Sequence, residues 1–125
     1  MAEYVTKKDL SVGYATAAEV AASRQGDCSE HAVLAAAMCR AVGLPARVVV
    51  GYAYVPEIAQ LEHVFVGHAW IEAYVGEKWM PLDPALEEFG PGHIAQAVGD
   101  GQPSDFFEAL GTMGKFEITE VSLGK

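Results

Sequence analysis

The central part of the chain carries one helix-like and three strand-like patterns of hydrophobic residues. Positions 28–42 are apolar on almost every side of a helix, which is typical of a helix buried on most sides. Residues 47–55 are rich in β-branched and aromatic side chains and predict a strand. Residues 64–75 and 78–83 predict two more strands, joined by a two-residue turn at 76–77 whose leading glycine favours type II′.

Capping signals predict where the helices begin and end. A threonine followed three residues later by a glutamate predicts a short helix over 17–23. Asp27 and Glu30 form a second signal of this kind, which makes Cys28 the first residue of the long helix. Gly43 is the residue expected just past the end of that helix.

The flanking segments carry weaker patterns. Residues 56–62 are interpreted as a connecting loop, and 87–125 as a loop-rich part because it is rich in glycine. Within that part, 104–110 predicts a short helix and 115–122 a final strand with alternating polarity. The length suits a single domain over 1–125, and the chain is consistent with a domain taken from a longer protein.

Composition narrows the class of protein. The 125 residues hold 8 Lys and Arg against 17 Asp and Glu, a net charge of −9, and 51% of them are hydrophobic. The charge excludes most nucleic-acid-binding roles, because phosphate binding requires a basic patch. No apolar run approaches the ~20 residues that cross a bilayer, so we expect no membrane segment. The 2 cysteines cannot build a disulfide scaffold, and we expect a reducing, cytoplasmic location.

Cys28 is placed where a reactive thiol is favoured. As the first residue of its helix, it lies among unpaired backbone N–H groups that favour a thiolate. The carboxylate of Asp27 disfavours that charge, so a cationic partner is needed, and histidine is the usual one. The 76–77 turn pairs residue 70 with 83, which makes His68 and Asp83 diagonal neighbours on adjacent strands.

Two segments carry a resemblance to a known family. They are GDCSEHAVLAAAMCRAVGLPARVVVGY and GHAWIEAYVGEKWMPLDPA. Together they resemble the transglutaminase-like superfamily, and the resemblance covers a motif core at 16–86. It implies an α+β fold of the papain-like kind, in which a buried helix that bears the cysteine packs on an antiparallel β-sheet. It also implies a catalytic triad of Cys28, His68 and Asp83.

The sequence departs from the family's calcium-dependent cross-linking enzymes in two ways. Those enzymes are much longer, multidomain chains, and they use an upstream aromatic residue to bind the oxyanion. No tryptophan precedes Cys28, and the candidates here are Gln25, Tyr14 and the backbone N–H of Cys28. Trp70, which lies close to His68 in the sequence, is a candidate wall of the cleft.

The resemblance implies acyl transfer by thiol chemistry. Cys28 would attack an amide or ester carbonyl, His68 would move the proton and Asp83 would orient His68, with a thioester as the intermediate. We expect hydrolysis of a peptide or amide bond, because water is always present and no amine-binding feature is visible. We expect a peptide or protein substrate and no cofactor. The oligomeric state stays open, and an inactive binding module of the same fold is the alternative.

A zinc site is a further alternative. Cys28 and His31, together with His63 and His68, could offer four ligands, but their spacing does not match a compact zinc motif. We therefore predict no metal site. His93 lies in a Gly-Pro-Gly segment and is expected at the surface.

Overall fold

The structure is a computed structural model that describes residues 4–5, 14–86 and 88–122. Within those residues, no helix is long and apolar enough to cross a membrane. The elements in chain order are α1 (Ala17–Ser23), α2 (Cys28–Ala41), β1 (Ala46–Ile58), β2 (Leu61–Val75), β3 (Lys78–Leu82), β4 (His93–Gly99) and α3 (Pro103–Thr112).

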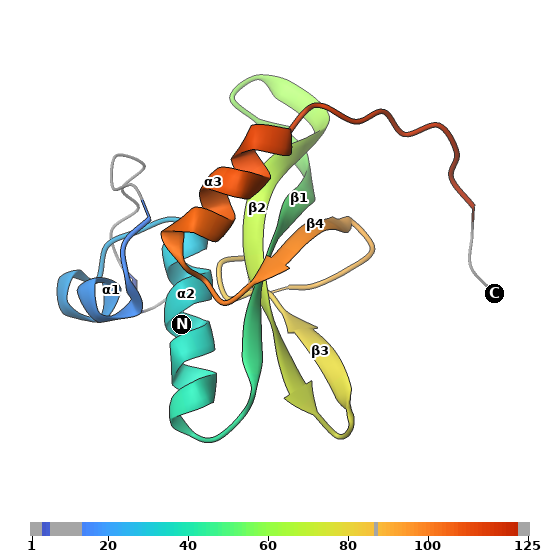
Figure 1. The fold of residues 1–125 in the computed structure, drawn as a ribbon. Coiled ribbons are helices and arrows are strands. Elements are labelled where there is room, and N and C mark those ends of the chain that lie inside the picture. The colour runs from blue at the N-terminus through green and yellow to red at the C-terminus, as the bar shows by residue number, and fades with distance from the viewer. Residues whose placement is uncertain (1–3, 6–13, 87, 123–125) are drawn as a thin grey trace.

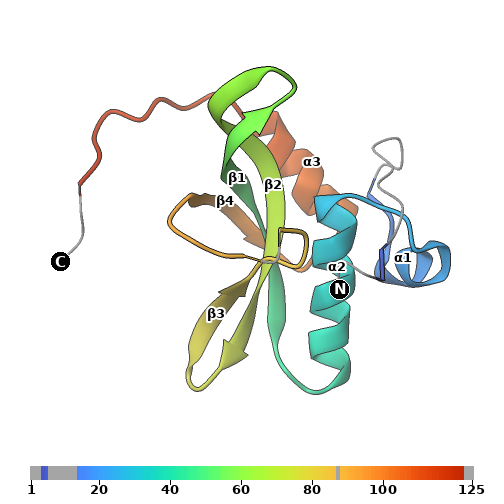
Figure 2. The same cartoon turned by 180° about the vertical axis from the view of Figure 1, so that it is seen from behind.

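The fold has two layers. Figure 1 shows α2 and α3 against one face of a twisted sheet, with α1 beside α2. The strand order is β3-β2-β1-β4, and every neighbouring pair is antiparallel. The predicted α+β arrangement, with the cysteine-bearing helix packed on an antiparallel sheet, is confirmed. Figure 2 gives the view from behind, where the segment after β3 crosses to the opposite edge of the sheet to enter β4.

The helix boundaries follow from the predicted caps. The Asp27 side chain accepts a hydrogen bond from the Ser29 N–H, and the Glu30 side chain accepts one from the Asp27 N–H, so both halves of the capping box are present. At the other end, Gly43 has a φ of 85°, which only glycine adopts without strain, and the chain leaves the helix there.

A small-residue core joins the two layers. Alanines of α2 pack against alternate residues of β1 and β2, and α3 adds one aromatic ring and one alanine. Small side chains let the helix approach the sheet closely, and alternation along the strands turns every second residue toward the helix. The cluster comprises Ala32, Ala35, Ala36, Ala46, Val48, Val50, Ala69, Ile71, Phe106 and Ala109.

The predicted hairpin register between β2 and β3 is confirmed, but its turn type is wrong. Val75 pairs with Lys78 and Ala73 with Met80, as the two-residue turn requires. Gly76 and Glu77 both have positive φ, 59° and 65°, which is type I′ rather than type II′. Type I′ matches the right-handed twist of the strands, and this outweighs the strain at Glu77.

Residues 56–62 do not form the predicted loop. β1 and β2 continue through them and join at a tight turn, where Ala59 and Gln60 take positive φ of 48° and 70°. Neither residue is glycine, asparagine or aspartate, so the sequence lacks the usual turn signal.

Two further differences lie in the C-terminal part. Residues 93–99, interpreted as loop, form β4 against β1. Residues 115–122, predicted as a strand, are extended but pair with no strand in the described part of the chain. Their alternating pattern is that of a half-buried strand, but among the described residues the segment adds to neither outer strand of the sheet, β3 or β4. The predicted helix at 104–110 is confirmed as the longer α3.

Candidate functional site

The start of α2 is held rigidly around Cys28. Glu30 is completely buried, and its carboxyl group accepts hydrogen bonds from the backbone N–H of Ala15 and of Asp27, each at 3.0 Å. Its side chain folds back over Gly26, where an added Cβ would lie 2.2 Å from the Glu30 Cβ. A glycine before the Asp-Cys pair is therefore a steric requirement of this loop.

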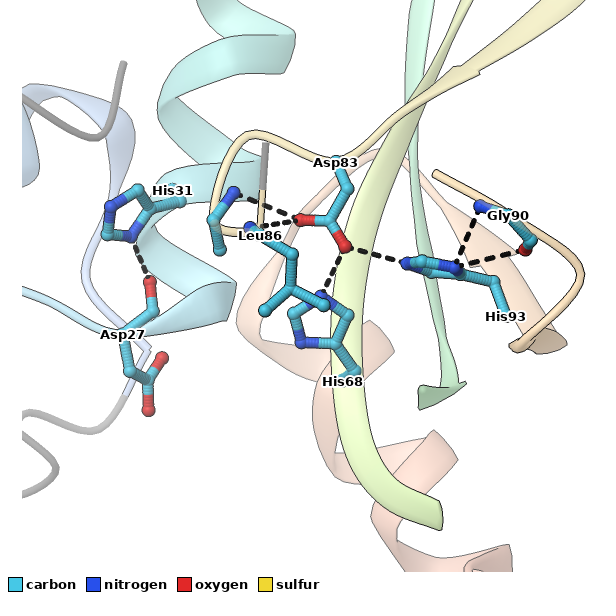
Figure 3. A network of polar contacts seen from close by, with 8 residues as sticks. Asp27, His31, His68, Asp83, Leu86, Gly90 and His93 are labelled. Carbon is cyan, nitrogen blue, oxygen red and sulfur yellow. Dashed lines mark hydrogen bonds and ion pairs between the residues drawn. The ribbon is translucent and has the colours of Figure 1, made fainter. Parts of the chain in front are cut away.

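His68 and Asp83 are brought together by the β2–β3 hairpin. Asp83 follows the last residue of β3, and its Oδ2 lies 2.6 Å from Nε2 of His68. His68 is 7% exposed and the Asp83 side chain is fully buried. Figure 3 shows the carboxyl group of Asp83 above the imidazole of His68. The diagonal contact is thus the one expected from the hairpin register.

The two groups stabilise each other's charge. Burial by itself lowers the pKa of His68, but hydrogen bonds to Asp83 and to the Cys28 side chain outweigh it and raise the pKa to about 9. Burial by itself raises the pKa of Asp83, but hydrogen bonds from His68, the Leu86 N–H and His93 lower it to about 2. At neutral pH the pair is therefore an imidazolium next to a carboxylate.

An apolar cavity of about 290 Å³ opens beside Cys28 and His68. Both side chains line it, so the thiol and the imidazole face the same space. α3 closes one side of this space, and β1 and β2 form its floor. The remaining lining residues are Tyr14, Asp27, Ser29, Val50, Gly67, Ala69, Phe106, Leu110 and Met113.

Of the two side chains considered as oxyanion donors, the structure places Tyr14 at the cavity and not Gln25. Gln25 is half-buried outside the set of lining residues. The Tyr14 ring stacks on Phe106 with centroids 4.7 Å apart. Burial and the negative charge of Asp27 raise the pKa of Tyr14, so its hydroxyl stays protonated and able to donate.

His93 is the residue that sequence reasoning missed. It was expected at the surface, but its Nε2 lies 2.7 Å from Oδ2 of Asp83, the same oxygen that contacts His68 (Figure 3). Its ring stacks on Phe89 with centroids 4.3 Å apart. The signal that could have found it is a histidine at the start of a short strand, but β4 itself was not recognised.

Trp70 does not form the predicted wall of the cavity. It is 2% exposed and packs edge-on against His93, with ring centroids 5.1 Å apart, and beside His68, with ring centroids 6.1 Å apart. Because it follows His68 by two positions on β2, it shares a face with His68 but lies deeper in the protein. Its indole supports the imidazole rings rather than facing a substrate.

The four side chains considered as zinc ligands do not lie close enough together to share one ion. His31 contacts the Asp27 carbonyl oxygen at 2.5 Å, and His63 is exposed and bound to Tyr54. In the described residues, the one group of three side chains close enough to share an ion is His68, Asp83 and His93, whose nitrogens already contact the carboxylate.

The chain is similar to known proteins in sequence and in fold. A family model described as the transglutaminase-like superfamily matches residues 2–84. The protein-glutamine gamma-glutamyltransferase of Pseudomonas aeruginosa is 33% identical over 93 residues, covering 66% of this chain and 13% of that protein. The crystal structure of a proposed cysteine protease from Cytophaga hutchinsonii superposes with a TM-score of 0.66 and 28% identity, covering 79% of this chain and 32% of that one. The chain therefore spans well under half the length of either protein.

Proposed function

Since the chain belongs to the transglutaminase-like superfamily, we propose that it is a cysteine enzyme that transfers an acyl group through a thioester on Cys28. The observation that supports this most directly is the cavity that Cys28 and His68 share, together with the hydrogen bond between Nε2 of His68 and the buried Asp83. The similarity to a cysteine protease and to a gamma-glutamyltransferase supports the same class of chemistry.

The proposed reaction begins with the Cys28 thiolate and the His68 imidazolium. The sulfur attacks the carbonyl carbon of an amide, and the oxyanion is met by the backbone N–H of Cys28 and the hydroxyl of Tyr14. The C–N bond breaks as the leaving amine takes the proton from His68. Asp83 occupies Nε2 of His68, which leaves Nδ1 as the nitrogen that serves the cysteine.

The thioester is then resolved by water, in our proposal. His68, now neutral, removes a proton from the water as its oxygen attacks the thioester carbon. The C–S bond breaks, which releases a carboxylic acid and returns the thiolate next to the imidazolium. An amine in place of water would give transamidation by the same steps, so the fold admits both outcomes.

The lining of the cavity supports an uncharged, apolar group on the acyl side of the substrate. Val50, Phe106, Leu110 and Met113 present hydrocarbon surface to it, and no lysine or arginine is among the described residues that line it. Asp27 lies at the same cavity, which disfavours an acidic substrate group there. We therefore propose a peptide or amide substrate with a neutral residue at the acyl position.

The test is the pH dependence of alkylation at Cys28, followed by mass spectrometry in the wild type and in His68→Ala. Cys39, half-buried near the other end of α2, is the internal control. We expect fast alkylation of Cys28 at pH 6, well below the value of about 8.5 at which a free thiol ionises, and its loss in the variant. Equal, slow reaction of both cysteines would overturn the proposal and leave a binding module of the same fold.

A further inference from the structure

We propose that His93 is a positioning residue that fixes the carboxylate of Asp83 in the orientation needed to hold His68. This inference rests on the proposed function, because it assigns His93 a role in the same acyl transfer. It goes beyond the Cys-His-Asp set, since His93 comes from β4 and follows the segment that the family model matches.

Four donors converge on Asp83. The backbone N–H groups of Ala85 and Leu86 donate to Oδ1 at 3.0 and 2.9 Å. On the other oxygen, Nε2 of His68 lies at 2.6 Å and Nε2 of His93 at 2.7 Å. An ionised carboxylate can only accept, so both imidazoles donate from Nε2. With donors on both oxygens, the plane of the carboxyl group cannot turn without breaking a hydrogen bond.

His93 is itself held in place on several sides. With the ring proton on Nε2, Nδ1 accepts from the Gly90 N–H at 3.5 Å, and the Gly90 carbonyl oxygen lies 3.2 Å from the same nitrogen, so the Gly90 backbone flanks the end of the ring away from Asp83. Phe89 stacks on one face of the ring, and Trp70 meets it edge-on. The ring of His68 lies 5.9 Å away, centroid to centroid. A surface histidine would not be anchored at both nitrogens and packed on by two aromatic rings.

The pairing of β1 with β2 and β4 places His68 and His93 on one face of the sheet, within reach of Asp83. Along β1, Gly51 lies opposite His68 and Ala53 lies opposite His93, so both rings stand on the same face. A Cβ on Gly51 would lie 2.0 Å from the Ile94 carbonyl oxygen, at the point where the β1–β4 ladder shifts register. This glycine therefore permits the close approach of β4 that carries His93 to Asp83.

A carboxylate held by four donors serves His68 in two ways. It remains ionised throughout the cycle, so it can stabilise the imidazolium without taking its proton. It also keeps Nε2 engaged, which holds the ring so that Nδ1 faces Cys28. Without His93, the Ala85 and Leu86 N–H groups still hold Oδ1, but His68 is the one donor left on Oδ2, so no contact independent of His68 fixes the position of that oxygen. The hydrogen bond to His68 then lengthens, and the imidazolium loses part of its stabilisation.

The experiment compares the wild type, His93→Ala, His93→Gln and the control variant His63→Ala. Glutamine offers an N–H donor close to the position of the histidine Nε2, whereas alanine offers none. His63 is an exposed histidine on the β1–β2 hairpin. His63→Ala therefore shows whether the loss of a histidine away from the site changes the same readouts. The readouts are the His68 titration by NMR of its ring nitrogens, Cys28 alkylation at pH 6, and kcat and KM on a peptide p-nitroanilide.

We expect His93→Ala to lower the His68 titration midpoint by about one pH unit and kcat by at least about tenfold, with KM within about twofold. His93→Gln should recover a substantial part of both, and His63→Ala should match the wild type. An unchanged His68 midpoint in folded His93→Ala, or no recovery in His93→Gln, would overturn the role of His93. Slow Cys28 alkylation in the wild type itself would instead overturn the proposed function, so the two failures are distinguishable.

Discussion

The carboxyl group of Glu30 accepts a hydrogen bond from the backbone N–H of Ala15 at 3.0 Å, across fifteen positions of sequence. This bond fastens the segment that carries Tyr14 to the first turn of the helix that carries Cys28. Burial and a hydrogen-bonding contact with Asp27 raise the pKa of Glu30, because both disfavour its ionised form.

Replacing Glu30 with alanine should therefore weaken both folding and activity. It would leave the buried N–H groups of Ala15 and Asp27 without acceptors, at about 1–3 kcal/mol each. We expect the free energy of unfolding to fall by about 2–4 kcal/mol in urea titrations. Glu30→Gln, which keeps one acceptor oxygen, should lose less. An unchanged midpoint for Glu30→Ala would mean that this buried contact carries little stability.

The pH dependence of stability should report the His68–Asp83 pair. Because the pKa of His68 is raised to about 9 in the folded protein, its contribution is complete below pH 6.5 and is lost as pH rises through 9. The depressed pKa of Asp83, about 2, gives a contribution that is present above about pH 4 and is lost as pH falls through 2.

We expect the free energy of unfolding of the wild type to decline between pH 6.5 and 9 by up to about 1.4 kcal/mol per pH unit. In His68→Ala this decline should be absent, and in His63→Ala it should persist. Parallel curves for the wild type and His68→Ala in urea titrations would contradict the raised pKa of His68.

Gly51→Ala should detach β4 from the site. The added methyl group would collide with the Ile94 backbone, which cannot move as a side chain end can. We expect a loss of about 2–4 kcal/mol in stability and weaker protection of the β4 amides in hydrogen exchange. As a matched control, Gly111→Ala adds a methyl group within α3 that meets no described atom within 4 Å beyond its chain neighbours and the backbone of its own helix, and it should weaken neither stability nor the protection of the β4 amides.

Met113→Ala should allow the cavity to accept larger acyl groups. The Met113 Sδ and Cε atoms would both lie 3.3 Å from a Cβ on Gly67, so this side chain packs across the cavity onto β2. Its removal should raise kcat/KM for p-nitroanilides with bulky aromatic acyl residues about tenfold relative to small ones. Val121→Ala, at an 83% exposed position outside the cavity, is the control. Equal ratios in both variants would show that Met113 does not limit acyl size.

The parts of the fold that local chemistry determines were predictable from the sequence. The caps at Asp27 and Glu30, the glycine after α2 and the position of the two-residue turn after Val75 are each signalled within a few residues, although the turn is type I′ and not the predicted type II′. The register between β2 and β3 follows from that turn, and the same register makes His68 and Asp83 neighbours.

The remainder depends on contacts between distant segments. β4 is short and its alanines, glutamine and glycine have weak strand propensity, so its pairing with β1 and not its own sequence makes it a strand. For the same reason the position of His93 could not be predicted. Residues 115–122 show the reverse case, because a clear alternating pattern is not sufficient to form a strand without a partner strand to pair with.

The strand order also has a consequence for the sequence of events in folding. β1, β2 and β3 are joined by two tight hairpins, so they can pair through contacts that are close along the chain, whereas β4 must return across the sheet to reach β1. His68 and Asp83 can thus meet on the nascent meander, and His93 joins them only when the last strand docks. We therefore expect the site to be completed late in folding, by a contact between distant parts of the chain, and fraying of β4 alone to break the His93–Asp83 contact while α2 stays folded.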